Sequence, residues 1–149
     1  MLAIYGNAEA MRFVGDGKPL DLQAYEGWIQ VILERYMRYG YGMSALAFQT
    51  TGEVVGFCGL VHPNYQIEAE IKYAIRQEFW GKGLATEAVA AMLECARNNF
   101  RLANVVATVN PMNAASQKVL LNAGMRKGNL RPNPDGSFTQ MFSWAANAA

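Results

Sequence analysis

Histidine, cysteine and proline are scarce in this chain of 149 residues, which has one His, two Cys and five Pro. The two cysteines, Cys58 and Cys95, lie far apart and form no CxxC pair. The sequence therefore suggests neither a zinc site nor a disulfide framework, and we expect no metal site. We expect both cysteines to be reduced and buried as small apolar side chains.

Net charge and long apolar runs are also missing. Thirteen basic and twelve acidic residues leave a formal charge of +1, and no block of like charges marks a nucleic-acid arm or a polybasic membrane patch. The apolar stretches fall well short of the ~20 residues that a membrane span needs, and residues 1–10 do not read as a signal peptide. We therefore expect a cytoplasmic protein that binds neither nucleic acid nor membrane.

The chain does contain enough apolar residues, 52% of the total, to bury one ordinary core. Its length is typical of a single domain, and no internal repeat, low-complexity run or linker divides it. We therefore expect a single domain over residues 1–149.

The first half of the chain changes from a helical to a strand pattern. Residues 8–14 favour a short helix, and apolar residues then recur every three or four positions from the N-cap Asp21 to Gly40. Residues 43–49 and 53–61 predict two antiparallel strands joined by a turn that contains glycine. In the alternating segment 67–75, the residues Ile71, Tyr73 and Ile75 share one face, and Glu70, Lys72 and Ala74 share the polar face.

The second half alternates helices with strands. It predicts a helix over 84–100, a buried strand over 104–109 and a helix over 114–123 that Asn113 caps. Residues 125–129 and 138–144 then favour a hairpin. The order indicates an α/β protein in which helices pack on a mixed sheet.

Two glycines, Gly81 and Gly83, stand between the third predicted strand and a helix. Such a loop presents unpaired backbone N–H groups at the positive end of the helix dipole, and the missing side chains let an anion approach closely. A phosphate group fits this loop best, and Lys82 adds a cation.

Two common phosphate motifs compete for this segment. A Walker A loop fails because Lys82 is followed by Gly83 instead of Ser or Thr. A dinucleotide fingerprint is weak because its third small position falls on Thr86 and the next strand is followed by Asn110 instead of an acidic residue. A nicotinamide-binding domain is therefore the less favoured reading.

From Glu70 to Met125 the sequence resembles the GNAT family of N-acetyltransferases, and most closely the branch of the ribosomal-protein N-terminal alanine and serine acetyltransferases. The family's acetyl-CoA loop has Gln or Arg, two free positions, Gly, one free position, and Gly or Ala. It falls here on residues 80–85, with Trp80 departing at the first place. A second block, 110–125, matches the family's Asn-x-x-Ser helix, and "AEIKYAI" is similar to its Glu-Ile-Gly-Tyr strand.

The resemblance implies a GNAT-like fold in which acetyl-CoA donates its acetyl group directly to a primary amine, on a peptide N-terminus, an amino acid or a small amine. It implies that the backbone from Gly81 to Thr86 binds the coenzyme diphosphate and that the pantetheine arm pairs near Ala74 and Ile75. The cofactor-binding residues it implies are Ala74, Ile75, Trp80, Gly81, Lys82, Gly83, Leu84, Ala85, Thr86, Asn113 and Ser116.

Glu70 is the candidate general base, acting through a water, and the alternative for it is a solvated or paired surface carboxylate. Ser116 matches the family's serine near the coenzyme sulfur and is the candidate proton donor to the departing thiolate. Alternatively, Ser116 satisfies the helix start, and Asn113 is a cap, a pantetheine contact or both.

Four further residues have a functional and a structural interpretation. His62 is the only histidine, but its position favours an ordinary loop residue over a base. Trp28, Tyr36 and Tyr39 are placed to line an acceptor pocket, although their helical spacing is more typical of core aromatics.

Family members usually begin with a strand and a full first helix, so we expect this chain to lack the usual first strand. An edge left uncovered would favour a homodimer that shields it. A non-catalytic acyl-CoA-binding protein derived from the same fold stays the alternative to an enzyme.

Overall fold

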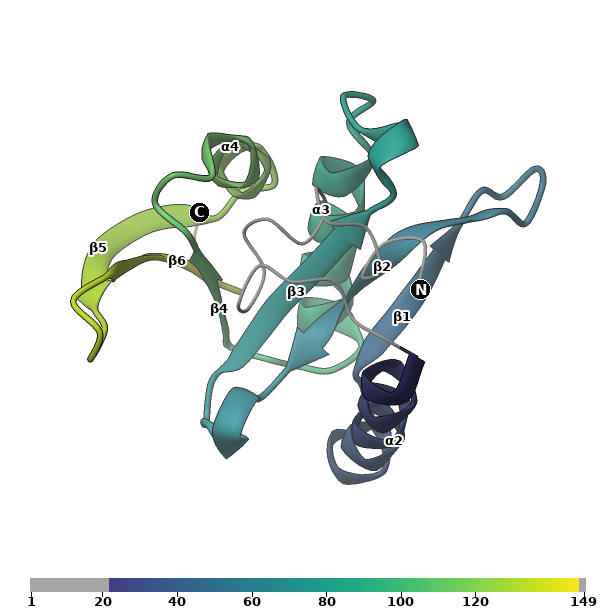
Figure 1. Ribbon diagram of the computed structural model, residues 1–149, viewed down its shortest axis with the longest axis horizontal. Coiled ribbons are helices and arrows are strands. Elements are labelled where there is room, and N and C mark those ends of the chain that lie inside the picture. The colour runs from purple at the N-terminus through teal and green to yellow at the C-terminus, as the bar shows by residue number, and fades with distance from the viewer. Residues whose placement is uncertain (1–21, 148–149) are drawn as a thin grey trace. The chain divides into compact units, whose positions relative to one another are not determined.

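The computed structural model describes residues 22–147 (Figure 1). The predicted helix over 8–14, the Asp21 cap and the expected loss of a first strand lie outside the described residues. Within them, no helix has both the length and the apolar composition that crossing a membrane requires.

The described chain forms a mixed sheet with helices, as the sequence predicts. The strands are β1 (Met43–Ala47), β2 (Val54–Val61), β3 (Ala69–Ile75), β4 (Asn104–Val109), β5 (Arg126–Pro132) and β6 (Phe138–Ala145). Their order in the sheet is β1-β2-β3-β4-β6-β5. The β1–β2, β4–β6 and β5–β6 pairs are antiparallel, whereas β3 pairs with β4 in parallel at Ala69–Val105 and Glu70–Val106.

The chain forms two compact units. One contains the residues up to Val61 together with Lys72–Ala85, and the other contains His62–Ile71 together with the residues from Thr86 onward. Strand β3 and helix α3 (Leu84–Asn98) run from one unit into the other.

In the first unit, the long helix α2 (Leu22–Tyr39) packs beside the β1–β2 pair (Figure 1). Trp28 and Ile32 contact a small core of Met43 and Phe57, and the rings of Trp28 and Phe57 meet edge to face at 6.2 Å. The helix ends where predicted, because Gly40 takes a φ of +78° and its N–H donates to the Tyr36 carbonyl.

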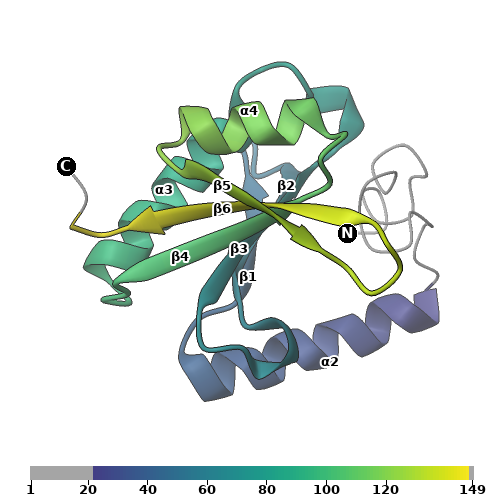
Figure 2. The same ribbon diagram turned by 90° about the vertical axis from the view of Figure 1, so that its left-hand side faces the viewer.

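In the second unit, β4 carries a buried face and pairs with β6 along its whole length. Val105, Ala107 and Val109 are buried, which confirms the predicted buried strand. Helix α3 buries Val89, Leu93 and Ala96. Helix α4 (Ala114–Asn122) lies near the β5–β6 hairpin (Figure 2) and buries Leu120.

The cysteines are both free, as expected, but only one is fully buried. Cys58 on β2 has no exposed surface, whereas Cys95 on α3 is half-buried. The expectation that both are buried is therefore wrong for Cys95, because it lies near the edge of the apolar stripe of α3 rather than at its centre.

Candidate active site

The glycine loop has the backbone conformation that only glycine adopts without strain. Gly81 and Gly83 have φ values of +78° and +77°, and both are exposed. A Cβ built on either glycine would meet no atom within 4 Å. Helix α3 begins at the next residue, Leu84, so the loop immediately precedes the N-terminus of a 15-residue helix. This exposed backbone, with the orphan N–H groups of a helix start, fits a diphosphate.

Trp80, the residue before the first glycine, ties the loop to strand β3. Its indole Nε1 donates to the Ile75 carbonyl at 2.7 Å, and its backbone N–H donates to the Gln77 carbonyl at 3.1 Å. About half of the Trp80 side chain is exposed. The sequence marks Trp80 as a departure from the family motif and, through the resemblance, as a cofactor-binding residue, but it does not predict this bond.

A second group of side chains holds the turn between β3 and the glycine loop. The guanidinium of Arg76 pairs with Glu78 at 2.6 Å and with Glu53 at 3.3 Å. Arg76 and Lys82 each lie over the ring of Phe79, at 5.4 and 5.6 Å from its centroid. Within the described residues Lys82 forms no ion pair.

Glu70 is buried, with 4% of its surface exposed, instead of lying on a solvated strand face. The Oγ1 hydroxyl of Thr108 on β4 donates to its Oε2 at 3.2 Å. The alternative of a solvated or paired surface carboxylate is therefore wrong, because Glu70 is buried. Sequence reasoning missed Thr108, whose signal is a hydroxyl residue in the otherwise apolar run "NVVATV".

Asn113 and Ser116 come together at the start of α4. The side-chain Oδ1 of Asn113 accepts a hydrogen bond from the Ser116 backbone N–H at 3.1 Å, which confirms the predicted cap. Because the cap uses the backbone of Ser116, it does not require the serine hydroxyl. Whether either side chain also contacts the coenzyme stays a prediction.

The other candidate residues have structural contacts. His62 is buried, and its Nδ1 lies 3.0 Å from the Gln66 carbonyl in the same loop. Trp28 packs into the core, Tyr36 donates to the Met43 carbonyl at 2.8 Å, and Tyr39 stacks on Tyr41 at 5.9 Å. The core interpretation fits Trp28, which is partly buried against that core, but it is wrong for Tyr36, which is exposed.

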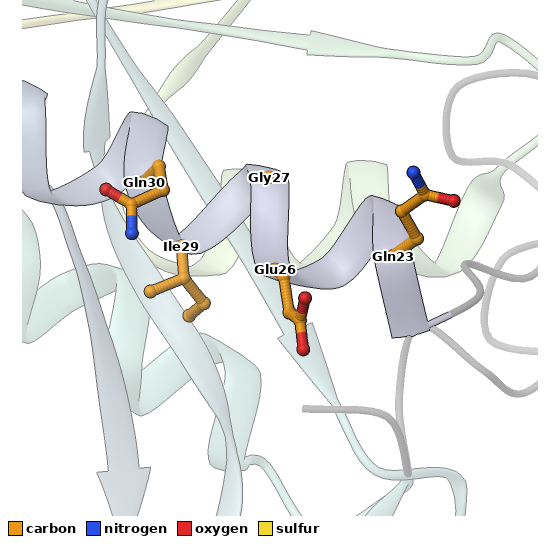
Figure 3. A pocket seen from close by; sticks show the side chains of 5 residues that line it. All are labelled: Gln23, Glu26, Gly27, Ile29 and Gln30. Carbon is orange, nitrogen blue, oxygen red and sulfur yellow. The ribbon is translucent and has the colours of Figure 1, made fainter.

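A hollow of about 580 Å³ lies along α2 and is separate from all of these residues. Among the described residues, those that line it belong to α2 (Figure 3) and are Gln23, Glu26, Gly27, Ile29 and Gln30. None of them belongs to the predicted coenzyme or catalytic residues. This hollow is therefore not the site that the glycine loop indicates.

The family model of the acetyltransferase (GNAT) domain matches residues 1–126 of this chain. The chain therefore belongs to the GNAT acetyltransferase family, a family of transferases that use acetyl-CoA. This confirms the resemblance carried by the glycine loop and by the α4 block.

Two curated relatives come from bacilli. YkkB of Bacillus subtilis is 34% identical over 90 residues, which cover 58% of this chain and 52% of YkkB. The N-acetyltransferase p20 of Bacillus licheniformis is 26% identical over 127 residues, which cover 85% of this chain and 71% of p20. The match thus spans about half the length of YkkB.

Solved structures share the fold. An acetyltransferase from Agrobacterium tumefaciens is 26% identical with a TM-score of 0.78, covering 95% of this chain and 82% of that chain. A ribosomal-protein-alanine N-acetyltransferase from Brucella melitensis has a TM-score of 0.73 at 18% identity, covering 97% and 91%. YncA of Salmonella typhimurium, described with its cofactor acetyl-CoA, has a TM-score of 0.75 at 16% identity, covering 98% and 86%.

Proposed function

We propose that this protein is an acetyl-CoA-dependent N-acetyltransferase whose acceptor is a primary amine on a peptide N-terminus, an amino acid or a small molecule. The observation that carries the proposal is the open glycine loop at the start of α3, where Gly81 and Gly83 hold positive φ angles. The loop leads directly into a 15-residue helix, whose first N–H groups have no partner within the helix and therefore suit an anion such as a diphosphate.

In this proposal the N–H groups from Gly81 to Thr86 hold the coenzyme diphosphate, and Lys82 adds its charge. The backbone near Ala74 and Ile75 takes the pantetheine arm, and Asn113 and Ser116 contact the same coenzyme. When bound, acetyl-CoA supplies a thioester whose acetyl group is reactive toward amines. No nucleophilic serine or cysteine is required.

The chain's own residues then handle protons. Glu70 accepts the amine proton through a water at a carboxylate oxygen, while the Ser116 hydroxyl donates a hydrogen bond toward the leaving sulfur. An α-amino group titrates near ~8 and a lysine near ~10.4, so an α-amine needs less help from a base at neutral pH. This favours peptide N-termini and amino acids among the acceptors.

Two broader expectations accompany the proposal. We propose that residues 1–149 act as one domain in the cytoplasm, and that the protein associates as a homodimer. Sedimentation velocity at micromolar concentration tests the last point, because a single monomeric species would contradict it.

The first experiment compares the melting temperature with and without acetyl-CoA, CoA and NADH. A ligand present at ~100 Kd stabilises a protein by about 2.7 kcal/mol, which is several degrees at this size. We expect a shift with acetyl-CoA and CoA but none with NADH. A shift with NADH alone would favour a nicotinamide-binding domain, and no shift at all would contradict the proposal.

The second experiment screens amines for release of the CoA thiol, measured with a colorimetric thiol reagent. We expect turnover with at least one class among α-amino peptides, amino acids, polyamines and aminoglycosides. Binding of acetyl-CoA without turnover on any class would favour the alternative, a non-catalytic acyl-CoA-binding protein.

A further inference from the structure

Trp80 connects two parts of the proposed coenzyme surface that are five residues apart in the chain. Its indole N–H donates to the carbonyl of Ile75, the last residue of β3, while its own backbone begins the glycine loop. At 2.7 Å this is a short hydrogen bond, and it ends on a residue with only 7% of its surface exposed. The bond therefore joins the glycine loop to the end of strand β3.

The direction of the Ile75 carbonyl follows from its neighbours. The Arg76 N–H donates to the Val55 carbonyl on β2 at 2.8 Å, and a Cβ on Gly56 would lie 2.3 Å from the Ala74 carbonyl. The backbones of Ala74 and Arg76 thus face β2. Because successive residues of a strand point their backbone groups to opposite sides, the carbonyl of Ile75 points away from β2. Trp80 therefore donates to β3 on the side of the strand that faces away from β2.

The turn between the strand and the loop is held at several points. A short helical turn, Gln77–Phe79, follows Arg76, and the Phe79 N–H donates to the Arg76 carbonyl at 2.9 Å. The Phe79 ring also meets Phe48 edge to face at 5.3 Å. The indole bond of Trp80 adds a contact that reaches from the start of the loop back to the end of β3.

We propose that Trp80 is a positioning residue that sets the spacing between the strand backbone at Ile75 and the N–H groups of the glycine loop. This inference rests on the proposed function, in which the pantetheine arm lies along the strand and the diphosphate lies on the loop. A ligand that joins two groups gains affinity over its parts only when the two subsites have the matching spacing. Replacing Trp80 should then weaken the binding of the whole coenzyme but leave the affinity for each half alone unchanged.

The test measures three dissociation constants by calorimetry, for acetyl-CoA, for adenosine 3′,5′-bisphosphate and for S-acetylpantetheine. Trp80→Phe keeps an aromatic ring but removes the N–H donor. We expect its Kd for acetyl-CoA to rise about tenfold, the effect of one lost hydrogen bond. We expect its Kd for each fragment to stay within about twofold of the wild type.

Two variants complete the design. Trp144→Phe makes the same chemical change on β6 and should leave all three constants unchanged. Trp80→His keeps a ring N–H and should recover part of the lost acetyl-CoA affinity, and it replaces Trp80→Phe if that variant does not fold.

The outcomes separate this inference from the proposed function. Equal weakening of a fragment and of acetyl-CoA in Trp80→Phe would mean that Trp80 is a direct contact, and a fall in kcat alone would mean a role in chemistry. Either result overturns the inference, as does an unchanged Kd for acetyl-CoA. A wild-type protein that binds no acetyl-CoA would instead overturn the proposed function.

Discussion

The Thr108 hydroxyl donates to Oε2 of Glu70 across 3.2 Å, and it joins two residues that are 38 positions apart in the chain. The pair lies beside the two residue pairs that define the parallel β3–β4 register. A carboxylate with 4% exposure is costly unless it is hydrogen-bonded, so this hydroxyl offsets part of the desolvation of Glu70. The same bond fixes where the candidate base points.

Thr108→Val should lower the free energy of unfolding by about 1.5–3 kcal/mol, because it leaves the buried Glu70 oxygen without this donor. Thr108→Ser keeps the hydroxyl and should cost less than Thr108→Val. Urea denaturation measures both. In the double variant with Glu70→Gln, the two losses should not add, since the residues interact directly. Additive losses would mean that the bond does not contribute to stability.

Glu70→Gln should reduce kcat by roughly 10²–10⁴, the usual range for removing a general base, with the Kd for acetyl-CoA nearly unchanged. Glu68→Gln is the matched control, because Glu68 precedes Glu70 by two positions and is exposed. Steady-state kinetics and calorimetry make the measurement. If Glu70→Gln keeps the kcat of the wild type, as Glu68→Gln is expected to, Glu70 is not the base.

Ser116→Ala should lower kcat and leave the Asn113 cap in place, because the cap uses the Ser116 backbone N–H and not its hydroxyl. Asn113→Ala removes the cap and should cost about 1 kcal/mol. Thermal unfolding and kinetics of the two variants separate the roles. A large stability loss in Ser116→Ala would assign that hydroxyl a structural role instead.

Gly83→Ala should destabilise the protein by roughly 1–2 kcal/mol, because alanine is strained at a φ of +77°. Its Cβ would also project into the open space above the loop, so the Kd for acetyl-CoA should rise roughly tenfold or more. Gly52→Ala is the matched control in the β1–β2 turn, with a φ of +74° and equally open space. Gly52→Ala should lose similar stability but keep the increase in melting temperature with acetyl-CoA. If Gly52→Ala also loses that increase, backbone strain alone explains the weaker binding of Gly83→Ala.

Tyr41 should make the protein less stable at alkaline pH. Burial, and secondarily the nearby Tyr39, raise the pKa of the Tyr41 phenol above its usual value of 10.0. Below pH 10 both the folded and the unfolded states keep the proton, so the full stability is present. As the pH rises through 10 and beyond, the unfolded state loses the proton first and stability falls.

The measurement compares the urea unfolding of wild type and Tyr41→Phe between pH 8 and pH 11. Lysines also titrate in this range, so the informative quantity is the difference between the two proteins. That difference should change in favour of Tyr41→Phe as the pH increases. A difference that is independent of pH would contradict the prediction.

Local features of the fold were predictable because neighbouring residues in the chain produce them. The repeat of apolar positions before Gly40 predicted α2, and the compact apolar run in 104–109 predicted β4. The cap at Asn113 and the glycine turn before Leu84 also depend on a few adjacent residues. For the same reason the family motif in 80–85 was visible without any structure.

The sequence by itself determined the order of helices and strands, the glycine loop and the family, because backbone preferences and apolar periodicity act over a few residues. Only the tertiary structure decided that Glu70 is buried against Thr108, since alternation shows which face a residue shares and not whether another strand covers that face. It likewise decided that Trp80 bonds to Ile75, because the path of a turn in space sets which donor meets which carbonyl.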